Sequence, residues 1–311
     1  MEAKKKTLLE IHNLSVAFWM YNGILTQDQL QVISDLQLTV YPGEIVAVAG
    51  SSGSGKSLLA SAILGLLPGN AVVRGHLYYR GKELDSVQQT RLRGKEIAWI
   101  PQSLTYLDPL MKVGKQADGH RKPYPTQKRR ALFQRLNLPK ETENLYPFQL
   151  SGGMARRVLV STAMLTDAQL VIADEPTPGM SLEQALEALK LFREMADQGR
   201  AVILITHDID LALAFADKIA VFYAGTTVEI ASASEFRMGP AALRHPYSKA
   251  LWQALPQNGF QPIEGFQPYA GALPKGCLFA PRCSQATKEC KEQKPAIRSV
   301  RGGEVRCFYA T

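Results

Sequence analysis

One glycine-rich segment has the composition and spacing needed to bind the phosphates of a nucleotide. Gly50–Ser57 reads Gly-Ser-Ser-Gly-Ser-Gly-Lys-Ser and fits the pattern G-x-x-x-x-G-K-[ST]. The glycines let backbone N–H groups turn inward around phosphate oxygens, and the positive end of a following helix adds to the attraction. In such a loop Lys56 reaches the β- and γ-phosphates and the Ser57 hydroxyl binds Mg²⁺. We therefore expect a nucleoside triphosphate to contact Gly50, Ser51, Gly53, Ser54, Gly55, Lys56, Ser57 and Leu58.

A pair of adjacent carboxylates follows a short apolar run. The segment Leu170–Glu175 reads Leu-Val-Ile-Ala-Asp-Glu, and carboxylates at the end of a buried strand are costly unless a cation or water uses them. Asp174 is placed to hold Mg²⁺, and Glu175 to orient and polarise an attacking water. Taken alone, Asp174 could instead cap the start of a helix.

A second apolar run ends in a histidine. In Ile203–Asp208, His207 follows Ile-Leu-Ile-Thr. A histidine at a strand end often has only a structural role. Beside a phosphate site it can also hydrogen-bond the γ-phosphate and so distinguish ATP from ADP. The residues by themselves leave both roles open.

The segment Leu150–Met154 makes the pattern specific to one family. It reads LSGGM, which is similar to the LSGGQ signature of the ATP-binding cassette transporters, with Met154 in the last place. Together with the motifs above, it makes residues 7–232 resemble the nucleotide-binding subunits of that family. The resemblance implies an α/β fold of the P-loop NTPase class, with a RecA-like core and a β subdomain. It assigns residues 1–232 to this domain and about 103–167 to its helical subdomain.

The resemblance also implies roles for residues outside these motifs. Gln102 is similar to the family's Q-loop glutamine, so it is expected to contact the nucleotide and to bind Mg²⁺ together with Ser57 and Asp174. His207 is similar to its switch histidine, acting beside the catalytic Glu175. Phe18 is similar to the aromatic residue that stacks on adenine, and Tyr21 is the second candidate for that contact. The implied cofactors are ATP and Mg²⁺.

The signature implies a partner subunit. Ser151, Gly152 and Gly153 precede a helix, so their N–H groups form a second phosphate-binding nest. In the family this nest closes on a nucleotide held by another subunit, which implies a dimer, here expected with a different but similar ATPase. Ser181 stands where the family usually has an aspartate that couples the two sites. A regulatory subunit that binds ATP and hydrolyses it weakly is therefore an alternative.

The C-terminal segment resembles one branch of the family. His245–Leu251 reads HPYSKAL, and together with Gly276–Cys283 it is similar to the tail of the oligopeptide, dipeptide and nickel importers. The resemblance makes residues 233–311 a C-terminal extension of that type. It implies an importer of peptides, nickel or other metal chelates. Such an importer also contains two transmembrane permease subunits and an extracytoplasmic substrate-binding protein.

All the cysteines of the chain lie in this extension. Four thiols on a short, loop-rich segment suit a bound metal or cluster that replaces a missing apolar core. Some subunits of the resembling branch carry a [4Fe–4S] cluster, and four cysteines suit its ligation. Zinc and free thiols remain alternatives, although the close C-x₂-C pairs common in zinc sites are absent. The residues concerned are Cys277, Cys283, Cys290 and Cys307.

Composition narrows the class of protein. The chain has 311 residues, of which 46% are hydrophobic and 21% charged, as in ordinary globular proteins. Its longest apolar runs fall far short of the ~18–20 residues that cross a bilayer, so we expect it to act at the cytoplasmic face of the cell membrane, held by its permease partners. The net charge of +8 permits an ATPase that acts on nucleic acid. The single cassette and the importer-like tail argue against that alternative.

The elements that must position these residues alternate along the chain. Short apolar runs predict strands at Leu8–Ile11, Gln31–Val40, Ile45–Ala49, Glu96–Ile100, Leu170–Ala173, Ala201–Thr206 and Lys218–Tyr223. Apolar residues three and four apart predict helices at Ser57–Leu67, Lys128–Leu136, Gly153–Met164, Leu182–Asp197 and Asp210–Ala216. This alternation favours a layered α/β protein with a parallel sheet.

Overall fold

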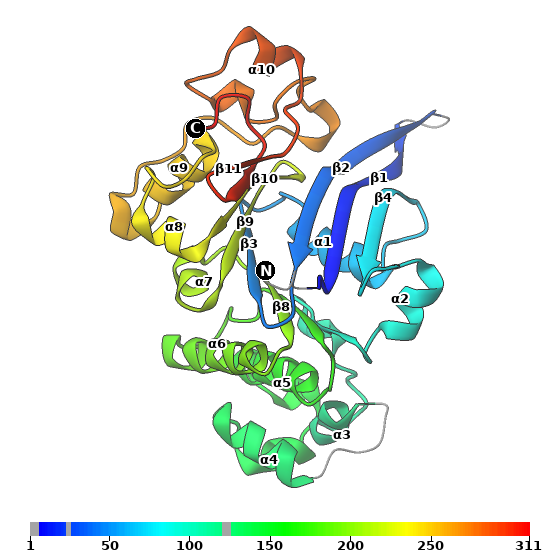
Figure 1. The fold of residues 1–311 in the computed structure, drawn as a ribbon. Coiled ribbons are helices and arrows are strands. Elements are labelled where there is room, and N and C mark those ends of the chain that lie inside the picture. The colour runs from blue at the N-terminus through cyan, green and yellow to red at the C-terminus, as the bar shows by residue number, and fades with distance from the viewer. Residues whose placement is uncertain (1–5, 23–25, 120–125) are drawn as a thin grey trace.

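The computed structural model describes residues 6–22, 26–119 and 126–311. Its strands form one eight-stranded and one four-stranded sheet, which lie side by side in Figure 1. The strands are β1 (Leu9–Asn22), β2 (Thr26–Val40), β3 (Ile45–Gly50), β4 (Ala71–Tyr79), β5 (Lys82–Glu83), β6 (Ile97–Ile100), β7 (Leu170–Asp174), β8 (Ala201–Ile205), β9 (Lys218–Tyr223), β10 (Thr226–Ser232), β11 (Arg298–Val300) and β12 (Gly303–Val305).

The larger sheet carries the parallel strands. Its order is β11-β12-β10-β9-β3-β8-β7-β6, and the five strands from β9 to β6 run parallel to one another. β3 lies near the middle, with Ala47 opposite Leu204 of β8 and Ile219 of β9. The remaining strands pair antiparallel. The smaller sheet, β2-β1-β4-β5, is antiparallel throughout.

Alternate residues of the central strands enter two different cores. On β3, Ile45, Ala47 and Ala49 pack into a cluster with α5 and α6, whereas Val46 and Val48 pack into a cluster shared with the smaller sheet and α1. Because both faces of the parallel strands are covered, their sequences read as continuous apolar runs.

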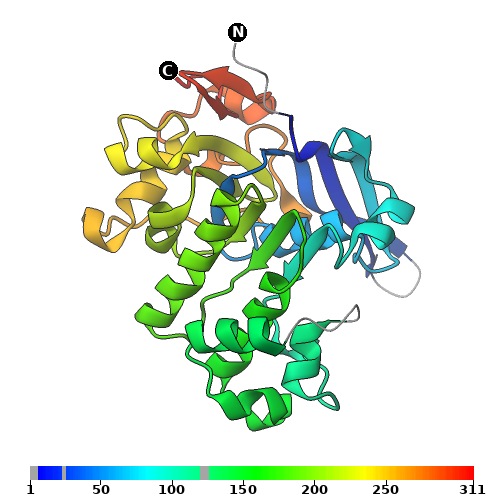
Figure 2. The same ribbon diagram turned by 60° about the horizontal axis from the view of Figure 1, so that its bottom comes forward.

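Helices cover both faces of the larger sheet, and the helices α3 to α5 form a region at one end of the molecule (Figures 1 and 2). The helices are α1 (Lys56–Leu64), α2 (Ser86–Leu92), α3 (Val113–Asp118), α4 (Thr126–Arg135), α5 (Gly152–Met164), α6 (Leu182–Asp197), α7 (Ile209–Phe215), α8 (Ala233–Met238), α9 (Pro246–Gln253) and α10 (Lys288–Glu292). Of the described helices, none combines the length and the apolar character needed to cross a membrane.

The expected strands and helices are confirmed, with differences at their ends. β1 and β2 are longer than expected because register shifts between Ile11 and Leu14 and between Val16 and Ala17 interrupt the strict alternation that marks a strand. β4 was not expected from the sequence. Its middle residues, Arg74 to His76, are exposed and give no apolar run.

Residues 233–311 attach to the larger sheet through a strand and a buried ion-pair network. β12 pairs with β10, placing Val305 opposite Glu229. The Arg244 side chain is fully buried and lies 3.3 Å from the Glu229 carboxylate, and it also pairs with Glu235. Arg306 joins the extension to β2 by donating to the Asp35 carboxylate at 2.6 Å. A buried charge without its partner is strongly destabilising, so these pairs fix where the extension docks.

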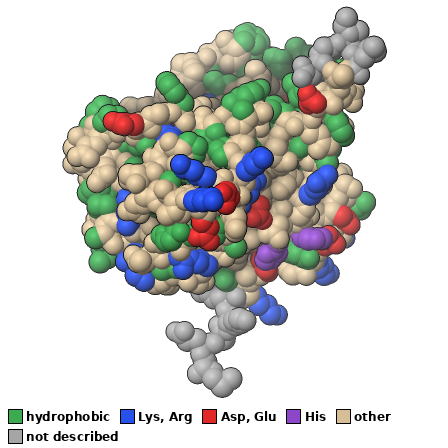
Figure 3. All heavy atoms as spheres, turned by 90° about the horizontal axis from the view of Figure 1, so that it is seen from above, with side chains coloured by type: hydrophobic (Ala, Val, Ile, Leu, Met, Phe, Trp, Pro, Cys, Tyr) green, Lys and Arg blue, Asp and Glu red, His purple; other side chains and the backbone are tan. Residues whose placement is uncertain are grey.

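The excess positive charge does not form one continuous basic area on the face that lies over the C-terminal region. In Figure 3, Lys and Arg side chains lie among Asp and Glu side chains on that face. This distribution is typical of a solvated protein surface.

Candidate active site

A cavity of about 410 Å³ lies against the glycine-rich loop. Of the eight loop residues expected to contact a nucleotide, all but Gly50 and Ser51 line it, as do Gln102, Glu175 and His207. Val32 and Ser52 also line it and were not expected. The lining residues are Val32, Ser52, Gly53, Ser54, Gly55, Lys56, Ser57, Leu58, Gln102, Glu175 and His207.

Four neighbouring parallel strands deliver these groups to one place. The glycine-rich loop leaves β3 at Gly50, Glu175 directly follows β7, His207 follows β8, and Gln102 follows β6. Because β3, β8, β7 and β6 are adjacent and parallel, their carboxyl ends lie at the same edge of the sheet. Segments far apart in the chain therefore meet at the cavity.

The loop is built around close backbone approaches. A Cβ at Gly50 would lie 2.3 Å from the Phe222 carbonyl oxygen, so only glycine fits there without a shift. Gly53 and Gly55 have φ values of 76° and 91°, which favour glycine. The buried Ser54 hydroxyl lines the cavity and has no hydrogen-bond partner among the described residues. A polar group of this kind suits an anionic ligand such as a phosphate.

Lys56 is held at the base of the cavity. Its Nζ donates to the carbonyl oxygens of Gly50 at 2.8 Å and Ser51 at 3.0 Å. Burial lowers the Lys56 pKa, whereas the nearby Glu175 and Asp174 carboxylates act to raise it. An anionic ligand would therefore meet a desolvated ammonium group at this position.

The Ser57 hydroxyl and the Asp174 carboxylate lie next to each other at the start of α1 and the end of β7. The Ser57 Oγ lies 3.1 Å from Asp174 Oδ1. Burial raises the Asp174 pKa, and the hydrogen bond from Ser57 opposes that rise. Oxygen ligands suit Mg²⁺, which is usually held by one or two carboxylates together with substrate phosphates. The donor set therefore fits a Mg²⁺ ion that arrives with a nucleotide.

Glu175 and His207 form a contact at the cavity wall. His207 Nδ1 lies 2.9 Å from each carboxylate oxygen of Glu175. Glu175 has a positive φ of 48°, a strained conformation for a residue other than glycine, and its N–H donates to the Ile205 carbonyl. Such strain is common at functional sites, and here it orients a carboxylate and an imidazole beside the phosphate loop.

Arg156 connects the signature helix to the segment that carries Gln102. Its guanidinium is 7% exposed and donates to the carbonyl oxygens of Pro101 at 2.9 Å and Gln102 at 2.5 Å. Burial lowers the Arg156 pKa, and the Asp174 and Glu175 carboxylates oppose this effect. Nothing in the local sequence predicts this role of Arg156, because it depends on a contact between two distant segments.

The signature residues lie outside the cavity. The Ser151 hydroxyl accepts from the Met154 N–H at 3.3 Å and caps α5. A Cβ at Gly153 would lie 2.6 Å from the Gly179 carbonyl oxygen, whereas a Cβ at Gly152 would meet no atom within 4 Å. The signature therefore packs against the loop that follows Glu175, and the helix N-terminus remains exposed.

The two aromatic candidates for an adenine contact also lie away from the lining. Among the described residues, β2 contributes Val32 to the cavity, and neither Phe18 nor Tyr21 lines it. Phe18 packs against the core beneath the smaller sheet, and Tyr21 is 75% exposed near the end of β1. Nothing in the local sequence singles out Val32, because its position depends on the register between β1 and β2.

The four cysteines surround one small cavity of about 20 Å³, together with His245 and Phe279. They form no disulfide, and burial raises the pKa of the Cys277 and Cys283 thiols. Within the described part of the chain, no group of three His, Cys, Asp or Glu side chains is placed to hold a metal ion. The four thiols therefore gather around one cavity, without the closer grouping that a single metal ion requires.

Comparison with known sequences gives matches along almost the whole chain. The family described as "ABC transporter" matches residues 33–178, and "Oligopeptide/dipeptide transporter, C-terminal region" matches residues 228–290. The oligopeptide transport ATP-binding protein OppD of Haemophilus influenzae is 33% identical over 318 residues, covering 96% of each chain. The dipeptide transport ATP-binding protein DppD of Escherichia coli is 34% identical over 325 residues, covering 97% of this chain and 96% of its own.

Solved structures share the fold at lower sequence identity. A dimeric ATP-binding cassette in a post-hydrolysis state, bound to ADP and Pi, matches with a TM-score of 0.64 and 23% identity, covering 73% of this chain and 99% of its own. An ATP-binding subunit of an ABC transporter matches with a TM-score of 0.61 and 24% identity, covering 74% and 92%. These likenesses show the cassette fold.

The packing of Gly153 gives a prediction for the isolated chain. Gly153→Ala should lower the free energy of unfolding by about 1–3 kcal/mol, because the new methyl group must displace the Gly179 backbone. The matched control is Gly152→Ala in the same helical turn, which should leave stability unchanged or slightly higher. Urea-induced unfolding of both variants measures the difference. Equal stability of the two variants would contradict the packing described here.

Proposed function

The chain belongs to the ABC transporter family and is an ATPase, and from this premise we propose that it powers peptide uptake by an importer, at the cytoplasmic face of the cell membrane. ATP hydrolysis by this chain is supported above all by the cavity that Lys56, Glu175 and His207 line together. The importer part is supported by the match of residues 228–290 to the oligopeptide/dipeptide C-terminal region.

The proposed chemistry assigns one task to each group. Lys56 and the loop N–H groups bind the β- and γ-phosphates. Ser57 and Asp174 hold Mg²⁺, which neutralises phosphate charge when bound. The Glu175 carboxylate accepts a hydrogen bond from the attacking water and polarises it. His207, which contacts Glu175 and lines the same cavity, would hydrogen-bond the γ-phosphate.

We further propose that ATP is enclosed by a second ATPase subunit. The N-terminus of α5 at Ser151, Gly152 and Gly153 is exposed and lies outside this chain's own cavity, and such a helix end attracts phosphate. A different but similar partner would make a heterodimer. Ser181 caps α6 by accepting from the Gln184 N–H at 3.3 Å. An aspartate at this position is the family's usual coupling residue, and its replacement is the reason for considering a regulatory subunit.

A groove beside the cavity suits a membrane permease. It has a volume of about 610 Å³, and its lining includes Trp99, Tyr106 and Thr162. The buried Trp99 Nε1 has no hydrogen-bond partner among the described residues. Pro101 lines this groove and the next residue, Gln102, lines the nucleotide cavity. A permease segment seated in the groove would therefore contact the backbone that positions Gln102.

The relatives named above transport oligopeptides and dipeptides, which supports a peptide cargo delivered by an extracytoplasmic binding protein. Nickel or another metal chelate is the other cargo that we propose, since the resembling importers include nickel systems. The cargo would be selected by the binding protein and the permeases, so the cavity of this chain does not discriminate between the two.

For the cysteines, we propose a [4Fe–4S] cluster ligated by Cys277, Cys283, Cys290 and Cys307. The support is the donor set, because four thiols from different segments of the extension surround one cavity without pairing as disulfides. A cluster is larger than a single ion, so its thiolates stand farther apart than zinc ligands do. When bound, the group would serve as a rigid core for the loops of this extension.

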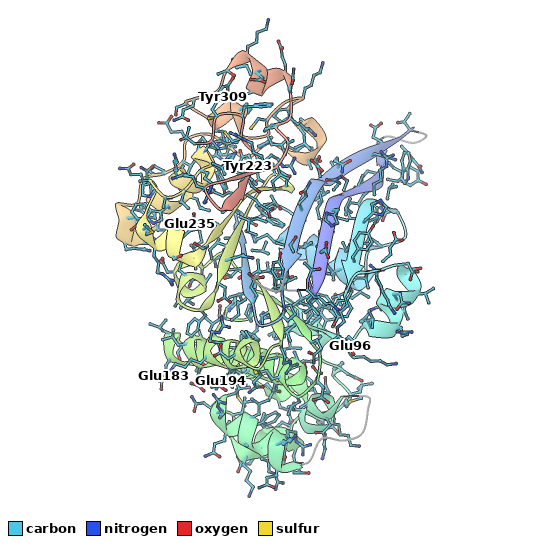
Figure 4. All side chains as sticks on the ribbon, viewed as in Figure 1. Glu96, Glu183, Glu194, Tyr223, Glu235 and Tyr309 are labelled. Atoms are coloured by element: carbon cyan, nitrogen blue, oxygen red, sulfur yellow. The ribbon has the colours of Figure 1, made fainter. Side chains whose placement is uncertain are left out.

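Hydrolysis at this site is tested by Glu175→Gln. The change removes the carboxylate that polarises water, so the ATPase rate should fall by about 10²–10⁴-fold. Binding of a fluorescent ATP analogue should persist, because Glu175 is not a phosphate ligand. The control is Glu183→Gln, at an exposed glutamate on α6 that does not line the cavity and is labelled in Figure 4. If the assembled complex is equally active with Glu175→Gln, the site is silent and the subunit is regulatory.

The permease groove is tested by Thr162→Arg. A long charged side chain in the groove should weaken co-purification with the permease subunits by at least about tenfold, because the charge would lose water on docking. Thr90→Arg on the exposed face of α2 is the matched control. The free energy of unfolding of both variants should change by less than about 0.5 kcal/mol. Undiminished co-purification of Thr162→Arg would place the permease elsewhere.

The cluster is tested by chemical analysis of chain purified without oxygen. Iron and inorganic sulfide should each approach about four per chain, with brown absorbance that Cys290→Ser abolishes. Stoichiometric zinc without visible absorbance would reject the cluster in favour of zinc. Absence of both metals, with four titratable thiols, would leave the cysteines free.

A further inference from the structure

A residue of the C-terminal extension contacts the phosphate loop directly. The Ser51 hydroxyl donates to Gln267 Oε1 at 2.6 Å. The same oxygen accepts from the Ala224 N–H at 3.4 Å, at the turn between β9 and β10. Gln267 is half-buried in the segment that joins α9 to the cysteine region. The loop that would cradle ATP is therefore held from outside by a residue 216 positions further along the chain.

Packed aromatic residues lie beside this contact. Tyr247, on α9, is 2% exposed. The Tyr247 ring lies 4.5 Å from the ring of Tyr223, which Figure 4 shows between the main sheet and the C-terminal region. Tyr223 precedes Ala224, whose N–H donates to the same Gln267 oxygen. The aromatic packing therefore helps to fix the turn that holds Gln267.

Ser51 is placed to transmit this support to the phosphate-binding groups. Its carbonyl oxygen accepts from Lys56 Nζ at 3.0 Å and from the Ser54 N–H at 3.2 Å. Its hydroxyl points the other way, to Gln267. The preceding residue, Gly50, is fixed by its close approach to the Phe222 carbonyl. Ser51 is therefore the point at which the outer support and the inner hydrogen bonds of the loop meet.

We propose that Gln267 is a positioning residue for the phosphate loop, so that the C-terminal extension forms part of the ATP site. Gln267 does not line the cavity and does not touch the reacting groups. It holds Ser51 so that the Ser51 carbonyl and the following N–H groups are preorganised for the triphosphate. This inference rests on the proposed hydrolysis of ATP at this loop.

The experiment measures ATP hydrolysis by the full chain in its assembled complex. Gln267→Ala should raise the KM for ATP about three- to tenfold, the effect expected from losing one hydrogen bond that orders the loop. The kcat should stay within about twofold, because Glu175 and His207 are untouched. Gln261→Ala, an exposed glutamine in the same segment, should leave both constants unchanged. A Gln267→Ala variant with wild-type KM would overturn the proposal.

A double-mutant cycle separates this role from general packing. Ser51→Ala removes the donor of the same hydrogen bond, so Ser51→Ala with Gln267→Ala should raise the KM no more than the larger single change. If the KM increases of the two single variants multiply in the double variant, the two residues act independently and the proposal is overturned. If the wild-type complex fails to hydrolyse ATP, the proposed function itself fails, and the two failures are therefore distinguishable.

Discussion

The carboxyl ends of four parallel strands meet at one edge of the larger sheet, and the candidate active site depends on that geometry. β3 supplies the phosphate loop, and β7, β8 and β6 are followed by Glu175, His207 and Gln102. None of these groups is near another in sequence. Their approach is fixed by backbone hydrogen bonds between strands that are buried on both faces. The backbone hydrogen bonds that stabilise the sheet therefore also place the chemical groups of the site.

Close backbone contacts set the finer positions. The absence of a Cβ at Gly50 lets the loop approach β9, and the same absence at Gly153 lets α5 approach the loop after Glu175. A buried charge also fixes the positions of two segments at once. Arg156 joins two backbone carbonyls while its guanidinium lies in the field of Asp174 and Glu175. A change at one of these positions would move several groups of the site together.

Local patterns predicted much of this arrangement, and non-local contacts account for what they missed. The phosphate loop, Glu175 and His207 could be identified because each follows a short apolar run with its own spacing. Val32 could not, because it reaches the cavity through the bulged pairing of β1 and β2. Gln267 gave no signal either, since its contact with Ser51 depends on how the C-terminal extension folds back across the sheet. The adenine contact expected of Phe18 stays a prediction, as the described cavity does not include that residue.

The order of strands in the larger sheet also bears on how the molecule is made. β10 pairs with β12, which follows it only after α8, α9, α10 and the cysteine loops have been synthesised. Until then one edge of the nascent sheet presents the unpaired N–H and C=O groups of β10. Open edges of this kind pair readily with other chains. Synthesis of β12 is thus the step that covers this edge of β10, and a chain cut before Gly303 would be liable to aggregate.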